Sequence, residues 1–162
     1  MTAPLVFVDT PVLLRTADDR DPDRQARARE WLRWCWTQRA GRISTQVLNE
    51  LYHNAITRFR SVMPVQQARA QVRNLRQWQP PHLDTYVIDG AWALQDRHAL
   101  GYWDALIVSS AQQQGCRYLL SEDLLPTTIR PAAKAQAPAS AGDARKQAAG
   151  KTLRTGLELH RL

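Results

Sequence analysis

The chain has 162 residues, of which 44% are apolar, and it carries a formal net charge of +7. A chain of this length can bury a core without disulfides or metals, and no stretch has the roughly 20 apolar residues that a membrane span requires. The N-terminal stretch MTAPLVFVDT has no basic region and only a short apolar run, which argues against a secretory signal peptide, so we expect a cytoplasmic protein with no membrane partner.

The first elements in chain order are a buried strand and a short helix. Residues 5–8 form a continuous apolar run that ends at Asp9, which is typical of a strand buried on both faces of a parallel sheet. Thr10 and Pro11 then open a short helix, because proline suits the first helical position.

Residues 19–38 predict a longer helix, and Gly41 is expected to end it. Tryptophans within it are candidates either for the core or for platforms on which bases stack, and their helical spacing favours the core. The apolar stripe of this helix consists of Ala28, Trp31, Leu32 and Cys35.

The middle of the chain predicts a short strand at residues 42–45 and two helices. Ser44 or Thr45 caps an amphipathic helix over residues 45–59, and Pro64 starts another helix that extends to residue 78. A loop follows at residues 79–84, and residues 85–99 come after it.

The last part of the main body predicts a helix from Asp104 to about residue 114, a stop at Gly115, and a strand over residues 116–123. Strands separated by helices imply an α/β fold with a mostly parallel sheet.

The composition changes after Leu125. Residues 126–162 hold seven basic and two acidic residues (7 − 2 = +5), so residues 1–125 carry only +2 from 15 basic and 13 acidic residues. The net charge is therefore weak support for nucleic-acid binding. We divide the chain into a folded domain (1–125), a basic Ala/Pro-rich low-complexity segment (126–152) that we expect to be disordered or loosely attached, and a possible terminal edge strand (153–162).

Several kinds of site are absent from the sequence. No G-x-G-x-x-G follows the first strand, the four histidines lack metal-ligand spacing, and no serine or cysteine lies in a nucleophile motif. Cys35 and Cys116 are far apart in the chain, and we expect both to be small buried apolar groups in a reducing compartment.

Four acids are candidates for a functional site. Asp9 and Asp123 each end a predicted strand, Asp104 begins a predicted helix, and Glu50 lies within one. Carboxyl ends of parallel strands and the helix N-termini that follow share one sheet edge, so three of the acids are expected to meet there. Crowded carboxylates repel one another unless a cation lies among them, and oxygen ligands suit Mg²⁺ or Mn²⁺. Such an ion can activate water and stabilise charge during attack on a phosphodiester.

Each acid also has a purely structural interpretation. Asp9 and Asp104 are both candidates for helix N-caps, and Asp104 is the better of the two. Glu50 lies opposite the apolar face of its helix, where a solvated side chain is the default. Asp123 and its neighbour Glu122 are ordinary residues for a turn.

The combination of segments is more specific than any one of them. LVFVDTPVLL, ISTQVLNELYHN, GYWDALIVSSA and YLLSEDL, in this order, resemble the PIN-domain ribonucleases, in particular the VapC-type toxins of prokaryotic toxin–antitoxin pairs, over residues 4–125. The resemblance implies a small three-layer α/β/α sandwich. It also implies that Asp9, Glu50, Asp104 and Asp123 are the catalytic and metal-binding acids, with Thr10 and Ser121 in support.

The same resemblance implies Mg²⁺- or Mn²⁺-dependent cleavage of single-stranded RNA, a cognate antitoxin and a homodimer. An alternative is a catalytically impaired binding module of the same fold that retains antitoxin or RNA binding. It is favoured by Pro11, where the family commonly has asparagine, and by the atypical C-terminal segment, which is either a basic arm for RNA or acquired sequence. A phosphatase of the haloacid-dehalogenase type needs a second aspartate at position 11 and ranks last.

Overall fold

The computed structural model describes residues 2–123 and 157–162, and its centre is a four-stranded sheet. All strands are parallel and their order is β2-β1-β3-β4. The segment 126–152, expected to be disordered or loosely attached, lies outside the described residues. The strands are β1 (Val6–Val8), β2 (Gly41–Arg42), β3 (Tyr118–Ser121) and β4 (Glu158–Arg161).

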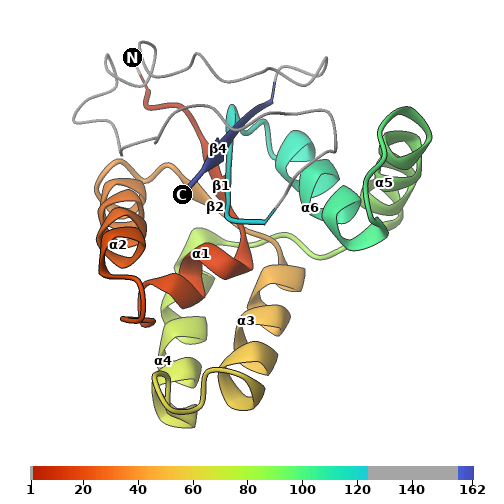
Figure 1. Ribbon diagram of the computed structural model, residues 1–162. Helices are drawn as coiled ribbons and strands as arrows, with labels where there is room; N and C mark the ends of the chain where they lie inside the picture. Colours follow the sequence, from red (N-terminus) through yellow and green to blue (C-terminus); the bar gives the residue numbers. More distant parts are fainter. Residues whose placement is uncertain (1, 124–156) are drawn as a thin grey trace.

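Helices cover both faces of the sheet and one of its ends. Figure 1 shows α2 on one side of the sheet, α5 and α6 on the other, and α3 and α4 beyond the end at which β1 leads into α1. The α/β/α arrangement and the parallel sheet expected from the sequence are thereby confirmed. The helices are α1 (Thr10–Arg15), α2 (Pro22–Thr37), α3 (Thr45–Thr57), α4 (Val65–Leu75), which continues as the 3₁₀ turn η1 (Arg76–Trp78), α5 (Thr85–Arg97) and α6 (Tyr102–Gln113).

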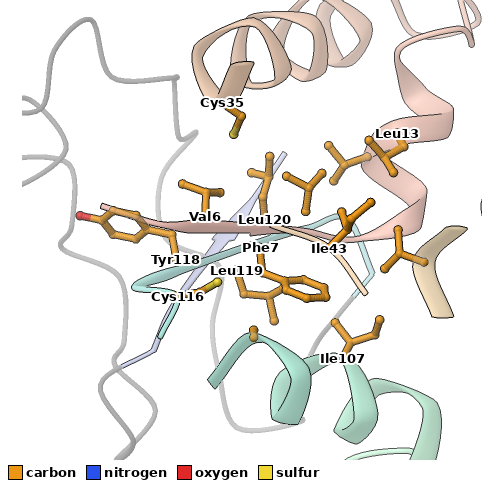
Figure 2. Packing of buried hydrophobic residues seen from close by; sticks show 14 of the residues in the cluster. Val6, Phe7, Leu13, Cys35, Ile43, Ile107, Cys116, Tyr118, Leu119 and Leu120 are labelled. Atoms are coloured by element: carbon orange, nitrogen blue, oxygen red, sulfur yellow. The ribbon is translucent and has the colours of Figure 1, made fainter. Parts of the chain in front are cut away.

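The core lies on both sides of the two central strands. Side chains alternate across a strand, so Val6 and Leu120 point toward α2 while Phe7 and Leu119 point toward α6 (Figure 2). All four are fully buried, as expected for strands covered by helices on both faces.

The expectations for tryptophan and cysteine are largely confirmed. Trp31 and Trp34 are buried in the core, and Cys35 and Cys116 are buried and unpaired. Burial raises the pKa of each thiol to about 12, because an apolar surrounding disfavours the thiolate. Neither cysteine is therefore a reactive nucleophile.

The connection from α2 to β2 differs from the prediction. The helix ends at Thr37, Arg39 takes up the left-handed conformation (φ 53°), and Gly41 begins β2 instead of stopping the helix. A Cβ atom at Gly41 would overlap the indole of Trp78, so glycine is needed here for close packing. The strand accordingly comprises Gly41–Arg42, earlier and shorter than the predicted 42–45.

Within the part of the chain that the structure describes, no helix is both long and apolar enough to cross a bilayer.

Candidate active site

The candidate site lies at the carboxyl edge of the central strands. Val8 pairs with Leu120, and the backbone N–H of Asp9 donates to the carbonyl of Leu120 (3.0 Å), so β1 and β3 end side by side. The parallel register brings together residues that are more than 110 positions apart in the chain.

Asp9 is 7% exposed and is anchored through both of its carboxylate oxygens. Oδ1 accepts from the backbone N–H of Thr10 (2.8 Å), which makes Asp9 the N-cap of α1, and Oδ2 accepts from the Ser121 hydroxyl (2.8 Å). The pKa of Asp9 is raised to about 6, chiefly by burial and to a smaller extent by the charges of Glu50 and Asp104, while the two hydrogen bonds oppose the rise.

Glu50 is held by a hydrogen bond at each oxygen. The Thr10 hydroxyl donates to Oε2 (2.9 Å), and the side-chain amide of Gln46, one turn earlier on α3, donates to Oε1 (2.9 Å). Glu50 is therefore half-buried and oriented toward the start of α1, unlike the solvated glutamate that its helix position suggests. Thr10 links the two acids, because its backbone contacts Asp9 while its hydroxyl contacts Glu50.

Asp104 is not the helix cap that its sequence context predicts. The N-cap of α6 is Gly101, and Asp104 is the third helical residue. The helix dipole still favours a negative charge at this position in the first turn. The described residues provide it with no hydrogen bond or ion pair, and partial desolvation, together with the charges of Asp123 and Glu50, raises its pKa.

Asp123 and Glu122 have different surroundings, although they are neighbours. Asp123 is exposed, lies within electrostatic range of Asp104, and lines a cavity of about 280 Å³ together with Pro11 and Arg58. Glu122 is 7% exposed and accepts two hydrogen bonds from Arg15 (2.7 and 3.0 Å). Glu122 therefore lies in the bend after β3, as its interpretation as a turn residue suggests, and in addition forms a buried ion pair.

The donor chemistry of the four acids fits a hard divalent cation. They supply only carboxylate oxygens, and the pKa values of Asp9 and Asp104 are raised, chiefly by desolvation and further by the neighbouring carboxylates, so both would gain from a nearby cation. No group of three Asp, Glu, His or Cys side chains within residues 2–123 and 157–162 is preformed for a metal ion. A cation bound here would therefore be held partly through water or after small side-chain movements.

Three features of the site were not recognised in the sequence. Gln46 was detectable, because residues four apart on a helix are neighbours. The pair of Arg15 and Glu122 spans 107 positions, and no local pattern indicates it. Trp103, next to Asp104 in the sequence, is 65% exposed.

Comparisons with known proteins agree with this architecture. The solved structures that resemble the chain include VapC20 of Mycobacterium tuberculosis, described as a sarcin-ricin loop cleaving toxin (19% identity, 70% of this chain and 86% of that chain covered, TM-score 0.52). They also include a toxin–antitoxin complex from Klebsiella pneumoniae (16% identity, 76% and 90% covered, TM-score 0.51). A third is VapBC2 from Rickettsia felis bound to a DNA fragment from its promoter (12% identity, 74% and 87% covered, TM-score 0.50).

At these identities the likeness is one of fold. Among curated protein sequences, none matches the chain. The model of the PIN domain family matches residues 6–124, which include β1 to β3 and all four acids. The chain therefore belongs to the PIN domain family.

Proposed function

We propose that this PIN-domain protein is an endoribonuclease that cleaves single-stranded RNA with the help of Mg²⁺ or Mn²⁺, and that it is the toxin of a toxin–antitoxin pair. The observation that carries the proposal is the crowding of Asp9, Glu50 and Asp104 at the carboxyl edge of the sheet, where burial first and the neighbouring carboxylates second raise the pKa of Asp9 and Asp104. A site that only stabilised the fold would gain nothing from such crowding.

Asp9, Glu50, Asp104 and Asp123 would together hold the cation. When bound, it would supply charge neutralisation for a phosphodiester and acidify a water molecule. Its charge would also lower the pKa of Asp9 and Asp104 and so favour the ionised form of both.

The remaining side chains would orient these acids and the RNA. Ser121 and the Thr10 backbone fix both oxygens of Asp9, while Thr10 and Gln46 fix those of Glu50, so neither carboxylate has to reorganise during the reaction. Arg58 lines the cavity beside Asp123 and forms no salt bridge within the described residues, which suits it to contact an RNA phosphate.

The proposed partners are an antitoxin and a second copy of the chain. The neighbours from Klebsiella pneumoniae and Rickettsia felis support the antitoxin, since the first is described as a toxin–antitoxin complex and the second as VapBC2. The homodimer rests on family resemblance. The alternative function is a PIN-fold binding module without catalysis, which is favoured by Pro11 at the rim of the cavity that also holds Asp123.

The test is cleavage of a pooled single-stranded RNA by the purified protein in Mg²⁺, in Mn²⁺ and in EDTA. Asp104→Asn is the site variant. Asp96→Asn is the matched control, because Asp96 is also an exposed helical aspartate, on α5, but is not one of the four acids.

We expect cleavage that requires metal, falls at least a hundredfold in Asp104→Asn and is unchanged in Asp96→Asn. Cleavage that persists in Asp104→Asn indicates a contaminating nuclease. A folded protein that binds RNA but never cuts it supports the binding module instead.

A further inference from the structure

One helical hairpin carries a larger net positive charge than the rest of the folded body. Residues 45–82, which contain α3, α4 and η1, hold five arginines and one acid, a net charge of +4. Residues 1–125 carry +2 in total, so the rest of that body is at −2. The five arginines are Arg58, Arg60, Arg69, Arg73 and Arg76.

Three of these arginines line one cavity. A cavity of about 790 Å³ lies between α3, α4 and the loop that follows η1. Arg69, Arg73 and Arg76 line it from one side; they recur every three or four residues and therefore share a helix face. Facing them from α3 are uncharged residues that include Thr45, Asn49 and Tyr52.

The charges of this cavity are not balanced within the described residues. No Asp or Glu lines the cavity, and none of the three arginines forms a salt bridge there. Like charges at these spacings destabilise a helix by a few tenths of a kcal/mol per pair. An arrangement that costs stability and presents guanidinium groups to a cavity is suited to an anionic ligand.

We infer that this cavity is an RNA-binding subsite, in which Arg69, Arg73 and Arg76 contact the phosphates of the strand that the acidic site is proposed to cleave. The aromatic and amide side chains of the lining favour RNA over an acidic peptide, and Leu48, Val72 and Pro80 supply its apolar part. Tyr52 and His82 offer rings on which bases stack, and Asn49 and Gln79 offer amides that pair with base edges.

The helix α3 connects this subsite to the acids. Asn49 lines the cavity while the next residue, Glu50, contacts Thr10, so the two sites lie on different faces of one helix. A strand that occupies both must pass over α3, which is about 10 Å across with its side chains. The subsite therefore holds nucleotides at a distance from the bond to be cut, and the inference rests on RNA being the ligand of the proposed function.

The experiment measures binding separately from cleavage. A fluorescent single-stranded RNA of mixed sequence is titrated in EDTA, with a gel to verify that it stays intact, at several salt concentrations. The site variant is Arg69→Gln/Arg73→Gln. The control Arg33→Gln/Arg97→Gln removes the same charge from exposed arginines of α2 and α5. Circular dichroism and thermal melting verify that both variants are folded.

We expect the site variant to bind about tenfold more weakly than the wild type, and its salt slope to fall by about 1.4, or 0.7 for each lost phosphate contact. The control should bind within twofold of the wild type. Equal losses in the two variants, or no loss in either, would overturn the inference.

Two further arms separate the alternatives. Poly-glutamate should compete with RNA only weakly; competition as strong as that of unlabelled RNA would assign the cavity to an acidic protein segment and overturn the RNA subsite. If the wild type binds RNA through these arginines but no metal supports cleavage, the proposed nuclease fails while the subsite stands.

Discussion

Asp9 combines two roles that place opposite demands on its carboxylate. As the N-cap of α1 and the acceptor of the Ser121 hydroxyl it is favoured as an anion, yet it is almost fully buried and close to Glu50 and Asp104. The effect of burial is larger than that of the hydrogen bonds, since the pKa of Asp9 rises from 3.8 to about 6. The folded protein therefore loses stability as Asp9 ionises, and a cation would recover it.

Asp9→Asn should therefore be more stable than the wild type at pH 7.5 but not at pH 4. An acid whose folded-state pKa is raised stabilises the fold below its unfolded-state pKa, and this contribution is lost as the pH rises from about 4 through 6. A shift of this size corresponds to about 3 kcal/mol at most. The measurement is urea unfolding from pH 4 to pH 8; a difference between the two proteins that does not change with pH would contradict the assignment.

Mn²⁺ binding provides a second measurement on the wild type and Asp9→Asn. At pH 7.5, Mn²⁺ should raise the melting temperature of the wild type more than that of Asp9→Asn, because the variant lacks one proposed ligand. Equal increases would remove Asp9 from the proposed cation site.

Thr10 is proposed to position Glu50 without touching the substrate. Thr10→Val removes the hydroxyl that donates to Glu50 and keeps the shape of the side chain. We expect kcat to fall about tenfold with KM unchanged, because an oriented carboxylate matters in the transition state. Thr10→Ser keeps the hydroxyl and should retain most of the activity. If both variants lose activity to the same extent, the methyl group and not the hydrogen bond is responsible.

At the scale of elements, Arg15 and Glu122 join α1 to the end of β3. The guanidinium donates two hydrogen bonds to Glu122 and one to Asp18, and Arg161 of β4 donates to the backbone carbonyl of Glu122. Helix α1, strand β3 and strand β4 thus meet at the residue that precedes Asp123. The pKa of Arg15 is raised, chiefly by its hydrogen bond to Glu122.

Arg15→Met should lower the free energy of unfolding by about 2–4 kcal/mol, because it leaves Glu122 buried without a partner. Adding Glu122→Gln to that variant should recover part of the loss, since the uncompensated charge is then absent. Chemical denaturation of the wild type, both single variants and the double variant measures the coupling. Strictly additive losses would show that the contact contributes nothing.

At the scale of the whole molecule, the sheet is completed by a strand from the far end of the sequence. Strand β4 lies within the stretch 153–162 for which the sequence predicts an edge strand, and it pairs in parallel with β3. His160 is buried against Tyr118 and Trp31, and Leu157 is 1% exposed. The C-terminal residues therefore belong to the same core as β1 and β3.

Leu157→Ala tests this integration. A fully buried leucine truncated to alanine costs about 2–5 kcal/mol, and we expect a loss in this range. Leu119→Ala in β3 serves as the positive control, since Leu119 is fully buried at the centre of the sheet. If Leu119→Ala destabilises the protein while Leu157→Ala leaves the unfolding midpoint unchanged, then β4 does not contribute to the cooperative fold.

Much of this fold was predictable because its signals are local. The apolar run before Asp9, the stripe at Trp31 and Cys35, and Pro64 before α4 each depend only on neighbouring residues, and the strand and the two helices that they predict are present. Boundaries were less predictable. Gly41 looked like a helix stop, whereas its actual role is to make room for Trp78, and Asp104 looked like a cap, whereas Gly101 fills that position.

The sequence by itself determined the α/β class, the parallel sheet and the four acids as candidates, because periodicity and the order of elements are properties of the chain alone. Their assignment to catalysis remains a prediction. Only the tertiary structure decided which oxygens of Asp9 and Glu50 are anchored, that Arg15 meets Glu122, and that three arginines face one cavity. The contacts of Asp9 with Ser121, of Glu50 with Thr10 and of Arg15 with Glu122 join residues that are distant in sequence. Their geometry exists only once the parallel strands and the helices across them have packed.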